Sequence, residues 1–206
     1  MNPYIADILA QPQALREGVS GYPSRAVRDL RNWLLKGDFD RILITGMGSS
    51  YNAAYPAVIQ LAGQAVPVEL VNTAELLHAR RGMIRPRSLL WMNSQSGESA
   101  EVVRLLEQIR HLRPACSLAF VNAASSSLAL EADVTVPIHA GPEATVSTKT
   151  YVNMLAANLL AASDLMGGDS EALAGELMAA AGVMEQYLAA WEDRAEEIDQ
   201  LLVNFE

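Results

Sequence analysis

A short apolar segment that stops at a serine-rich turn places the strongest constraint on how this chain folds. The run Leu89–Met92 is followed directly by the polar stretch Asn93-Ser94-Gln95-Ser96-Gly97-Glu98-Ser99. Beyond this stretch, apolar side chains recur at helical spacing: Val102, Val103, Leu105, Leu106 and Ile109. This order predicts a buried strand, a tight polar turn and the start of a helix.

The same design occurs earlier in the chain. The apolar run Ile42–Thr45 leads into Gly46-Met47-Gly48-Ser49-Ser50-Tyr51-Asn52, and a helical pattern follows. If both strands belong to one parallel sheet, both turns lie at its carboxyl edge, where open α/β sheets hold their ligands. The two turns are therefore expected to lie close together.

Strands and helices alternate along most of the chain. The strand patterns are apolar on both faces, and they cover residues 41–45, 66–71, 88–93, 116–121 and 134–138. Such strands are typical of a parallel sheet that is covered by helices on both sides. We therefore expect an α/β fold: a three-layer αβα sandwich around a five-stranded parallel, doubly wound sheet, with extra helices at both ends of the chain.

Three regions follow from this pattern. Residues 1–37 are expected to form N-terminal helices, with a kink or a second start at Pro12 and a helix end at Gly37. Residues 38–166 are expected to form the α/β domain. Residues 167–206 are expected to form further helices.

The C-terminal region carries apolar side chains that the sheet has no room for. They recur at roughly helical spacing: Val183, Met184, Tyr187, Leu188, Trp191, Ile198, Leu201, Leu202 and Phe205. We expect them to pack on another subunit, which favours a homodimer, or on a further domain.

The two serine-rich turns suit an anionic ligand. The first backbone N–H groups of a helix have no partner within the helix, and they lie at the positive end of its dipole, so a phosphate is a natural guest. Serine hydroxyls can donate to phosphate oxygens without adding charge. The alternative is that Ser99 is only the N-cap of its helix. Gly46-x-Gly48 lacks the third glycine of a dinucleotide-binding turn, and no P-loop lysine follows it.

Composition narrows the possible partners. The formal charge of −9 argues against nucleic acid, because binding to nucleic acid needs a basic surface. The single cysteine, Cys116, lies in an expected buried strand and suits a reducing cytoplasm. Neither a signal peptide nor a membrane-spanning run is visible, so we expect a cytoplasmic protein without membrane contact. We expect no metal and no cofactor.

Several motifs together resemble the sugar isomerase (SIS) domain. The closest resemblance is to the first SIS domain in the isomerase half of glucosamine-6-phosphate synthase and to related aminosugar- or fructosamine-phosphate isomerases and deaminases. The matching motifs are Gln11-Pro12, Gly48–Asn52, Ala74–His78, Ser94–Ser99, Gly141–Glu143 and Val146–Lys149.

This resemblance implies a ligand and site residues. The ligand would be a sugar phosphate such as fructose 6-phosphate or glucosamine 6-phosphate. The residues implied to bind it are Ser94, Gln95, Ser96 and Ser99 at the phosphate, Ser50 from the first turn, and Thr145 and Ser147 from a later loop at the sugar. Relatives of this type have a second SIS domain, which holds the catalytic glutamate, lysine and histidine. The resemblance therefore implies that residues 167–206 are linker and dimerisation helices that lead toward a second SIS domain absent from this sequence. No nucleophilic cysteine stands at the N-terminus, so we expect no glutaminase activity.

The sequence does not identify a catalytic base. Isomerisation of an aldose to a ketose needs an acid and a base as well as a phosphate anchor. Glu143, His139 and His78 are candidates, whereas Glu98 is expected to brace a loop or cap a helix, and Lys149 is as compatible with a surface charge as with a loop clamp. Two functions stay open: the phosphate-binding half of an isomerase or deaminase, and a non-catalytic sugar-phosphate sensor.

Overall fold

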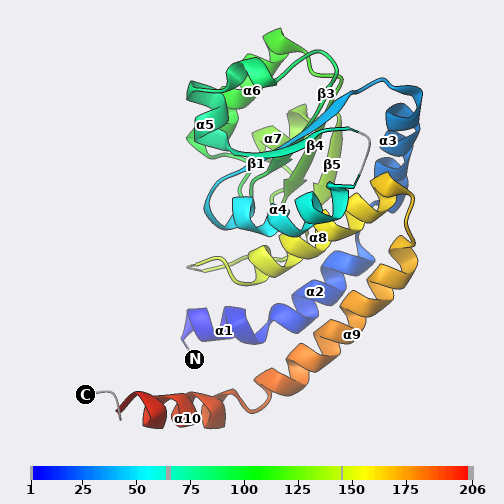
Figure 1. Cartoon of the computed structure of the whole chain (residues 1–206). Helices are drawn as coiled ribbons and strands as arrows, with labels where there is room; N and C mark the ends of the chain where they lie inside the picture. Colours follow the sequence, from blue (N-terminus) through cyan, green and yellow to red (C-terminus); the bar gives the residue numbers. More distant parts are fainter. Residues whose placement is uncertain (1, 64–65, 145, 204–206) are drawn as a thin grey trace.

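The computed structural model describes residues 2–63, 66–144 and 146–203, and it contains one sheet in which all the strands are parallel. The strand order is β2-β1-β3-β4-β5 (Figure 1). The strands are β1 (Arg41–Gly46), β2 (Val68–Asn72), β3 (Ser88–Asn93), β4 (Cys116–Val121) and β5 (Val134–Pro137). The chain reverses its direction of travel across the sheet after β2, so the predicted doubly wound parallel sheet is confirmed.

Helices cover both faces of the sheet. Beneath one face lie α3 (Ser24–Lys36), α4 (Gly48–Leu61) and α8 (Lys149–Met166), and on the other lie α5 (Thr73–His78), α6 (Ala100–Leu112) and α7 (Ser127–Glu131) (Figure 1). A short 3-10 helix, η1 (Arg81–Met83), follows α5. Alternate strand residues supply the two cores, with Ile42 and Ile44 facing α4 and Leu43 facing α5 and α6. This arrangement is the predicted three-layer sandwich.

The N-terminal and C-terminal helices add a partial further layer outside α8. The helices of this layer are α1 (Pro3–Leu9), α2 (Gln11–Ser20) and α9 (Ser170–Leu188), and α10 (Trp191–Val203) continues beyond the end of α9. Pro12 stands in the first turn of α2. Of the two expected alternatives, a kink or a second helix start, the structure therefore shows the second. Helix α2 packs between α8 and α9. None of the helices in the described ranges is long and apolar enough to cross a membrane.

The C-terminal apolar side chains stay largely uncovered by the rest of the described chain. On α9, Val183 and Tyr187 are exposed, and so are Ile198, Leu201 and Leu202 on α10. Figure 1 shows α10 pointing away from the sheet at the end of the long α9. Phe205 lies outside the described residues. Met184 packs against the cluster that α2, α8 and α9 share, so the expectation that it packs on another subunit or domain is wrong for this residue.

A buried polar network joins the central strand to α8. The Asn158 side chain accepts a hydrogen bond from Trp91 Nε1 at 2.8 Å and donates to Asn93 Oδ1 at 2.8 Å. Trp91 also stacks on Phe120 with ring centroids 5.0 Å apart. Asn93 Nδ2 in turn donates to the Thr45 carbonyl at 3.3 Å. The carboxyl ends of β1 and β3 are therefore fixed both by the sheet and by a side-chain network behind it.

We expect Asn158→Leu to lower the free energy of unfolding by about 3 kcal/mol, because it leaves two buried polar groups without partners. Denaturation in urea measures this loss. Trp91→Phe removes the indole donor from the other side, so the double variant should lose less than the sum of the two single variants. Strictly additive losses would show that the two side chains do not act as one network.

Candidate functional site

The first serine-rich turn connects β1 to α4. Its Gly46 allows the helix to begin very close to the strand, since a Cβ at this position would lie 2.9 Å from the Tyr51 nitrogen. Ser50 stands in the first turn of α4. The N-cap residue of α4 is Met47, whose side chain makes no capping hydrogen bond. The start of α4 therefore keeps N–H groups that a ligand can satisfy.

The second turn connects β3 to α6, and its own serines hold it in shape. Ser94 Oγ accepts a hydrogen bond from the Gly97 amide at 3.1 Å, and Ser96 Oγ accepts one from the Glu98 amide at 3.2 Å. Gly97 has a φ of 65°, which glycine adopts without strain. Because each hydroxyl oxygen accepts from within the turn, each O–H proton remains available to donate to a ligand.

Ser99 occupies the N-cap position of α6. Its backbone has the extended conformation of an N-cap, but its side chain makes no capping hydrogen bond. Ser99 thus stands at the N-cap position, as the capping alternative expects. It lacks, however, the side-chain hydrogen bond by which an N-cap residue stabilises its helix. Its hydroxyl is therefore available to a ligand, and α6, like α4, begins without a side-chain cap.

The two turns meet at one hollow. In the sheet, Gly46 at the end of β1 is paired in register with Asn93 at the end of β3, which brings the turns side by side. The hollow has a volume of about 170 Å³. It is lined by Met47, Ser50, Asn93, Ser94, Gln95, Ser96, Ser99 and Val102. Five of the seven residues predicted to bind the ligand thus lie together, and none of the lining residues is charged.

Asn93 is a lining residue that the sequence interpretation did not single out. It is buried, and its side chain spans from the Asn158 amide to the Thr45 carbonyl beneath the hollow. Its position as the last polar residue of an apolar strand is a signal that could have identified it. Asn93 forms part of the floor and holds the two strand ends at a fixed separation.

The loop between β5 and α8, residues 138–148, carries the other two predicted contacts. Thr145 lies outside the described residues. Ser147 is exposed, does not line the hollow, and shares a hydrogen bond of 2.8 Å with the Thr150 hydroxyl. The structure therefore does not bring Ser147 together with the five residues of the two turns.

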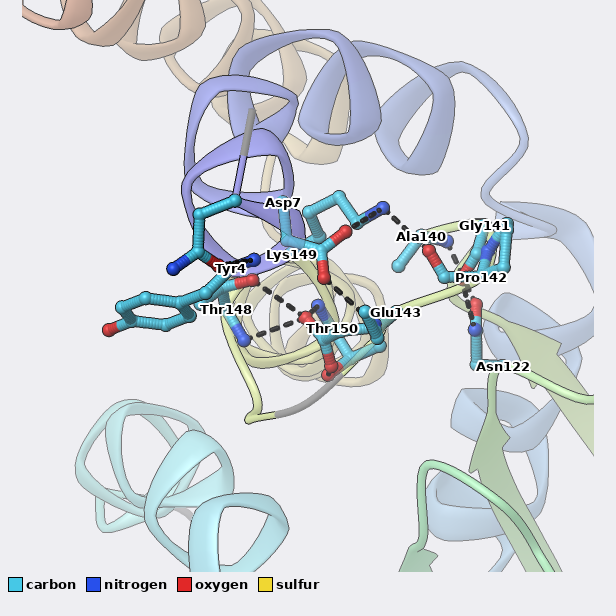
Figure 2. Close-up of polar contacts among 12 residues, drawn as sticks. Tyr4, Asp7, Asn122, Ala140, Gly141, Pro142, Glu143, Thr148, Lys149 and Thr150 are labelled. Carbon is cyan, nitrogen blue, oxygen red and sulfur yellow. Dashed lines mark hydrogen bonds and ion pairs between the residues drawn. The ribbon is translucent and has the colours of Figure 1, made fainter.

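Glu143 caps the start of α8. Its carboxylate accepts hydrogen bonds from the Thr148 amide at 2.7 Å, the Thr148 hydroxyl at 2.8 Å and both polar groups of Thr150 (Figure 2). Burial alone would raise the pKa of Glu143, but these hydrogen bonds outweigh burial and lower it. A carboxylate that is ionised and engaged in this way is poorly suited to act as a base near neutral pH.

The other acid–base candidates do not line the hollow between the two serine-rich turns. Glu98 accepts hydrogen bonds from the amide and the hydroxyl of Ser127 at the start of α7, which is the bracing role expected for it. His78 is exposed at the end of α5. His139 has a φ of 52° and lines a second hollow, of about 480 Å³, together with Glu17, Asn122, Gly141 and Pro142.

Lys149 proves to be a clamp rather than a surface charge. Its ammonium group lies 2.9 Å from Asp7 Oδ1 and donates to the Pro142 carbonyl at 2.6 Å (Figure 2). Asp7 Oδ2 accepts a hydrogen bond from the Ala144 amide at 2.8 Å. Sequence reasoning did not identify Asp7, because its partners lie more than a hundred residues away and nothing local distinguishes it.

The sequence of this chain is similar to those of known proteins. Residues 38–163 match the family model described as the SIS domain. Over 208 residues the chain is 31% identical to glutamine–fructose-6-phosphate aminotransferase (isomerizing) of Bacillus cereus, covering 98% of this chain and 34% of that enzyme. The enzyme of the same name from Pyrococcus horikoshii is 35% identical over 164 residues, covering 78% of this chain and 27% of that enzyme. The chain thus spans about a third or less of the length of these relatives.

Solved structures share the fold. The C-terminal domain of glucosamine-fructose-6-phosphate aminotransferase from Francisella tularensis superposes with a TM-score of 0.76 at 23% identity, covering 98% of this chain and 59% of that one. A candidate phosphosugar isomerase from Silicibacter pomeroyi gives a TM-score of 0.69 at 26% identity, covering 92% of this chain and 56% of that one. The match over residues 38–163, together with a relative at 31% identity along nearly the whole chain, shows that this chain belongs to the SIS domain family.

Proposed function

We propose that the chain binds a sugar phosphate and that the phosphate occupies the hollow between the two serine-rich turns. The observation that carries this proposal is the convergence of Ser50, Ser94, Gln95, Ser96 and Ser99 on one hollow at the starts of two helices that have no side-chain cap. Helix N-termini and neutral donors together suit a dianion. The relatives at 31% and 35% identity, whose names include fructose 6-phosphate, support the same class of ligand.

The size of the hollow supports a division of the ligand into two parts. Its 170 Å³ is below the roughly 300–1,000 Å³ that is usual for a whole small-molecule site. A phosphate group fits within it, and the sugar then extends beyond the turns along the carboxyl edge of the sheet. The loop of residues 138–148 follows β5 at this same edge, which supports the proposed role of Ser147 and Thr145 at the sugar.

For the complete protein we propose a phosphosugar isomerase, or an aminosugar- or fructosamine-phosphate deaminase, to which this chain contributes the phosphate-binding half. Glu98 and Glu143 are both engaged at helix starts, which supports the proposal that a second SIS domain supplies the acid and the base. The uncovered faces of α9 and α10 support residues 167–206 as the connection to that domain and as the contact in a homodimer. A buried, unpaired Cys116 is consistent with the cytoplasmic setting that we propose. The names of the relatives do not favour the sensor alternative.

Calorimetric titration with fructose 6-phosphate tests the proposal, with unphosphorylated fructose as the control ligand. We expect saturable binding of the phosphate ester and none of fructose. Ser99→Ala should weaken binding by about tenfold or more, because one donor to a charged group is lost. Its melting temperature should stay unchanged, since the Ser99 hydroxyl makes no capping bond.

Two results would contradict the proposal. Equal affinity for fructose and its phosphate ester would show that the hollow does not bind phosphate. Turnover of fructose 6-phosphate or glucosamine 6-phosphate by this chain alone would show that no second half is needed for catalysis.

A further inference from the structure

Helix α1 is anchored to the domain through a carboxylate. Asp7 is the buried residue of α1, and its side chain is about one-tenth exposed, whereas the apolar Ile5, Ile8 and Leu9 are only partly buried. A short surface helix ordinarily attaches through an apolar stripe that faces the core. The charge on Asp7 therefore has a specific task, and its contacts identify it.

Asp7 holds the loop of residues 138–148 at two places. One carboxylate oxygen accepts from the Ala144 amide at 2.8 Å, and the other lies 2.9 Å from the Lys149 ammonium group, which in turn donates to the Pro142 carbonyl at 2.6 Å. Figure 2 shows the Asp7 side chain of α1 beside Lys149. The hydrogen bonds from Ala144 and Lys149 lower the pKa of the Asp7 carboxyl, so it is ionised at neutral pH.

The other end of the same loop is connected by hydrogen bonds to the hollow between the two serine-rich turns. The Asn122 side chain donates to the Gly141 carbonyl at 2.7 Å and accepts from the Ala140 amide at 2.9 Å. The Asn122 amide donates to the carbonyl of Gln95, which lines the hollow, at 3.0 Å. The loop is thus held between the β3–α6 turn on one side and α1 on the other.

We propose that Asp7 is a positioning residue for recognition of the sugar: it fixes the loop in the shape in which the loop meets the sugar end of the ligand, without contacting the phosphate. This inference rests on the proposed function, because it assigns the phosphate to the serine hollow and the sugar to the loop. Asp7 lies outside the matched residues 38–163. Selectivity among sugar phosphates would then be set by a helix that precedes the SIS domain.

Hydrogen exchange tests, without any ligand, whether Asp7 holds the loop in place. In Asp7→Asn, which keeps the shape and removes the charge, we expect the Ala144 amide to exchange about tenfold faster or more, while the Gly97 amide in the β3–α6 turn keeps its rate. Asp7→Glu, which retains the charge, should give an intermediate rate. An unchanged rate at Ala144 in Asp7→Asn would overturn the proposal.

Binding tests the consequence for the ligand. For Asp7→Asn we expect about tenfold weaker binding of fructose 6-phosphate and a change of less than about twofold for inorganic phosphate, because the latter fills only the hollow. Equal losses for both ligands would place the effect at the hollow and overturn the positioning role. Glu185→Gln, which removes the ion pair between Arg16 of α2 and α9, is the matched control and should change neither affinity.

The two proposals fail in different ways. If the unaltered chain binds neither fructose 6-phosphate nor inorganic phosphate, the proposed function is wrong. The exchange rates at Ala144 then still decide whether Asp7 holds the loop in place. If the unaltered chain binds both ligands and Asp7→Asn binds both with unchanged affinity, the hollow assignment stands and the positioning role is overturned.

Discussion

Replacing Ser94 and Ser96 together with alanine is expected to weaken the binding of fructose 6-phosphate by at least about a hundredfold. In the proposed site each hydroxyl would donate to a charged phosphate, and loss of such a donor costs about 1.5–3 kcal/mol. Both residues line the hollow, and both oxygens already accept hydrogen bonds from within the turn. Calorimetry with the double variant and the two single variants measures the loss.

The same substitutions also test how the turn is held. Removing the two hydroxyls deprives the Gly97 and Glu98 amides of their acceptors, so we expect the ligand-free double variant to lose about 1–2 kcal/mol of stability. Ser20→Ala, at an exposed position of α2, controls for loss of a serine far from the turns. Unchanged affinity in a folded Ser94/Ser96 double variant would show that the phosphate lies elsewhere.

Most of the fold could be predicted from local sequence patterns. The strand predicted at residues 88–93 matches β3 and that at 116–121 matches β4, because short apolar runs bounded by polar turns leave little choice of period or length. Gly37 ends α3 in the left-handed conformation, as its position after Lys36 indicates. The meeting of the two serine turns was predictable as well, since parallel strands bring their carboxyl ends to one edge.

Contacts between distant segments were not predictable. The pair Asp7 and Lys149 joins residues far apart in the sequence, and so does the bond from Trp91 to Asn158. Residue type alone left Lys149 between a surface charge and a clamp, because burial of a lysine depends on a partner that local spacing does not reveal. The capping role of Glu143 likewise depends on the path of the loop before α8, which a single sequence does not specify.

Gly97 is the position in the candidate site where the smallest side chain matters most. Gly97→Ala is expected to lower the free energy of unfolding by about 3 kcal/mol or more and to abolish measurable binding of the phosphate ester. Its φ of 65° is unfavourable for alanine, and an added Cβ would lie 2.1 Å from Ser126 Oγ and 2.6 Å from Ser126 Cβ. Since Ser126 caps α7 and Leu128 N donates to the Gly97 carbonyl, the turn cannot move without disturbing α7.

A second substitution separates the clash from the backbone strain. In Gly97→Ala with Ser126→Gly, the overlapping side chain is gone, and a glycine cap costs only a few tenths of a kcal/mol, so we expect about half of the lost stability to return. The unfavourable φ remains in both variants. Urea denaturation and titration with fructose 6-phosphate measure the two effects. No recovery in the double variant would refute the steric explanation, whereas full binding by Gly97→Ala alone would mean that the shape of the β3–α6 turn does not determine phosphate binding.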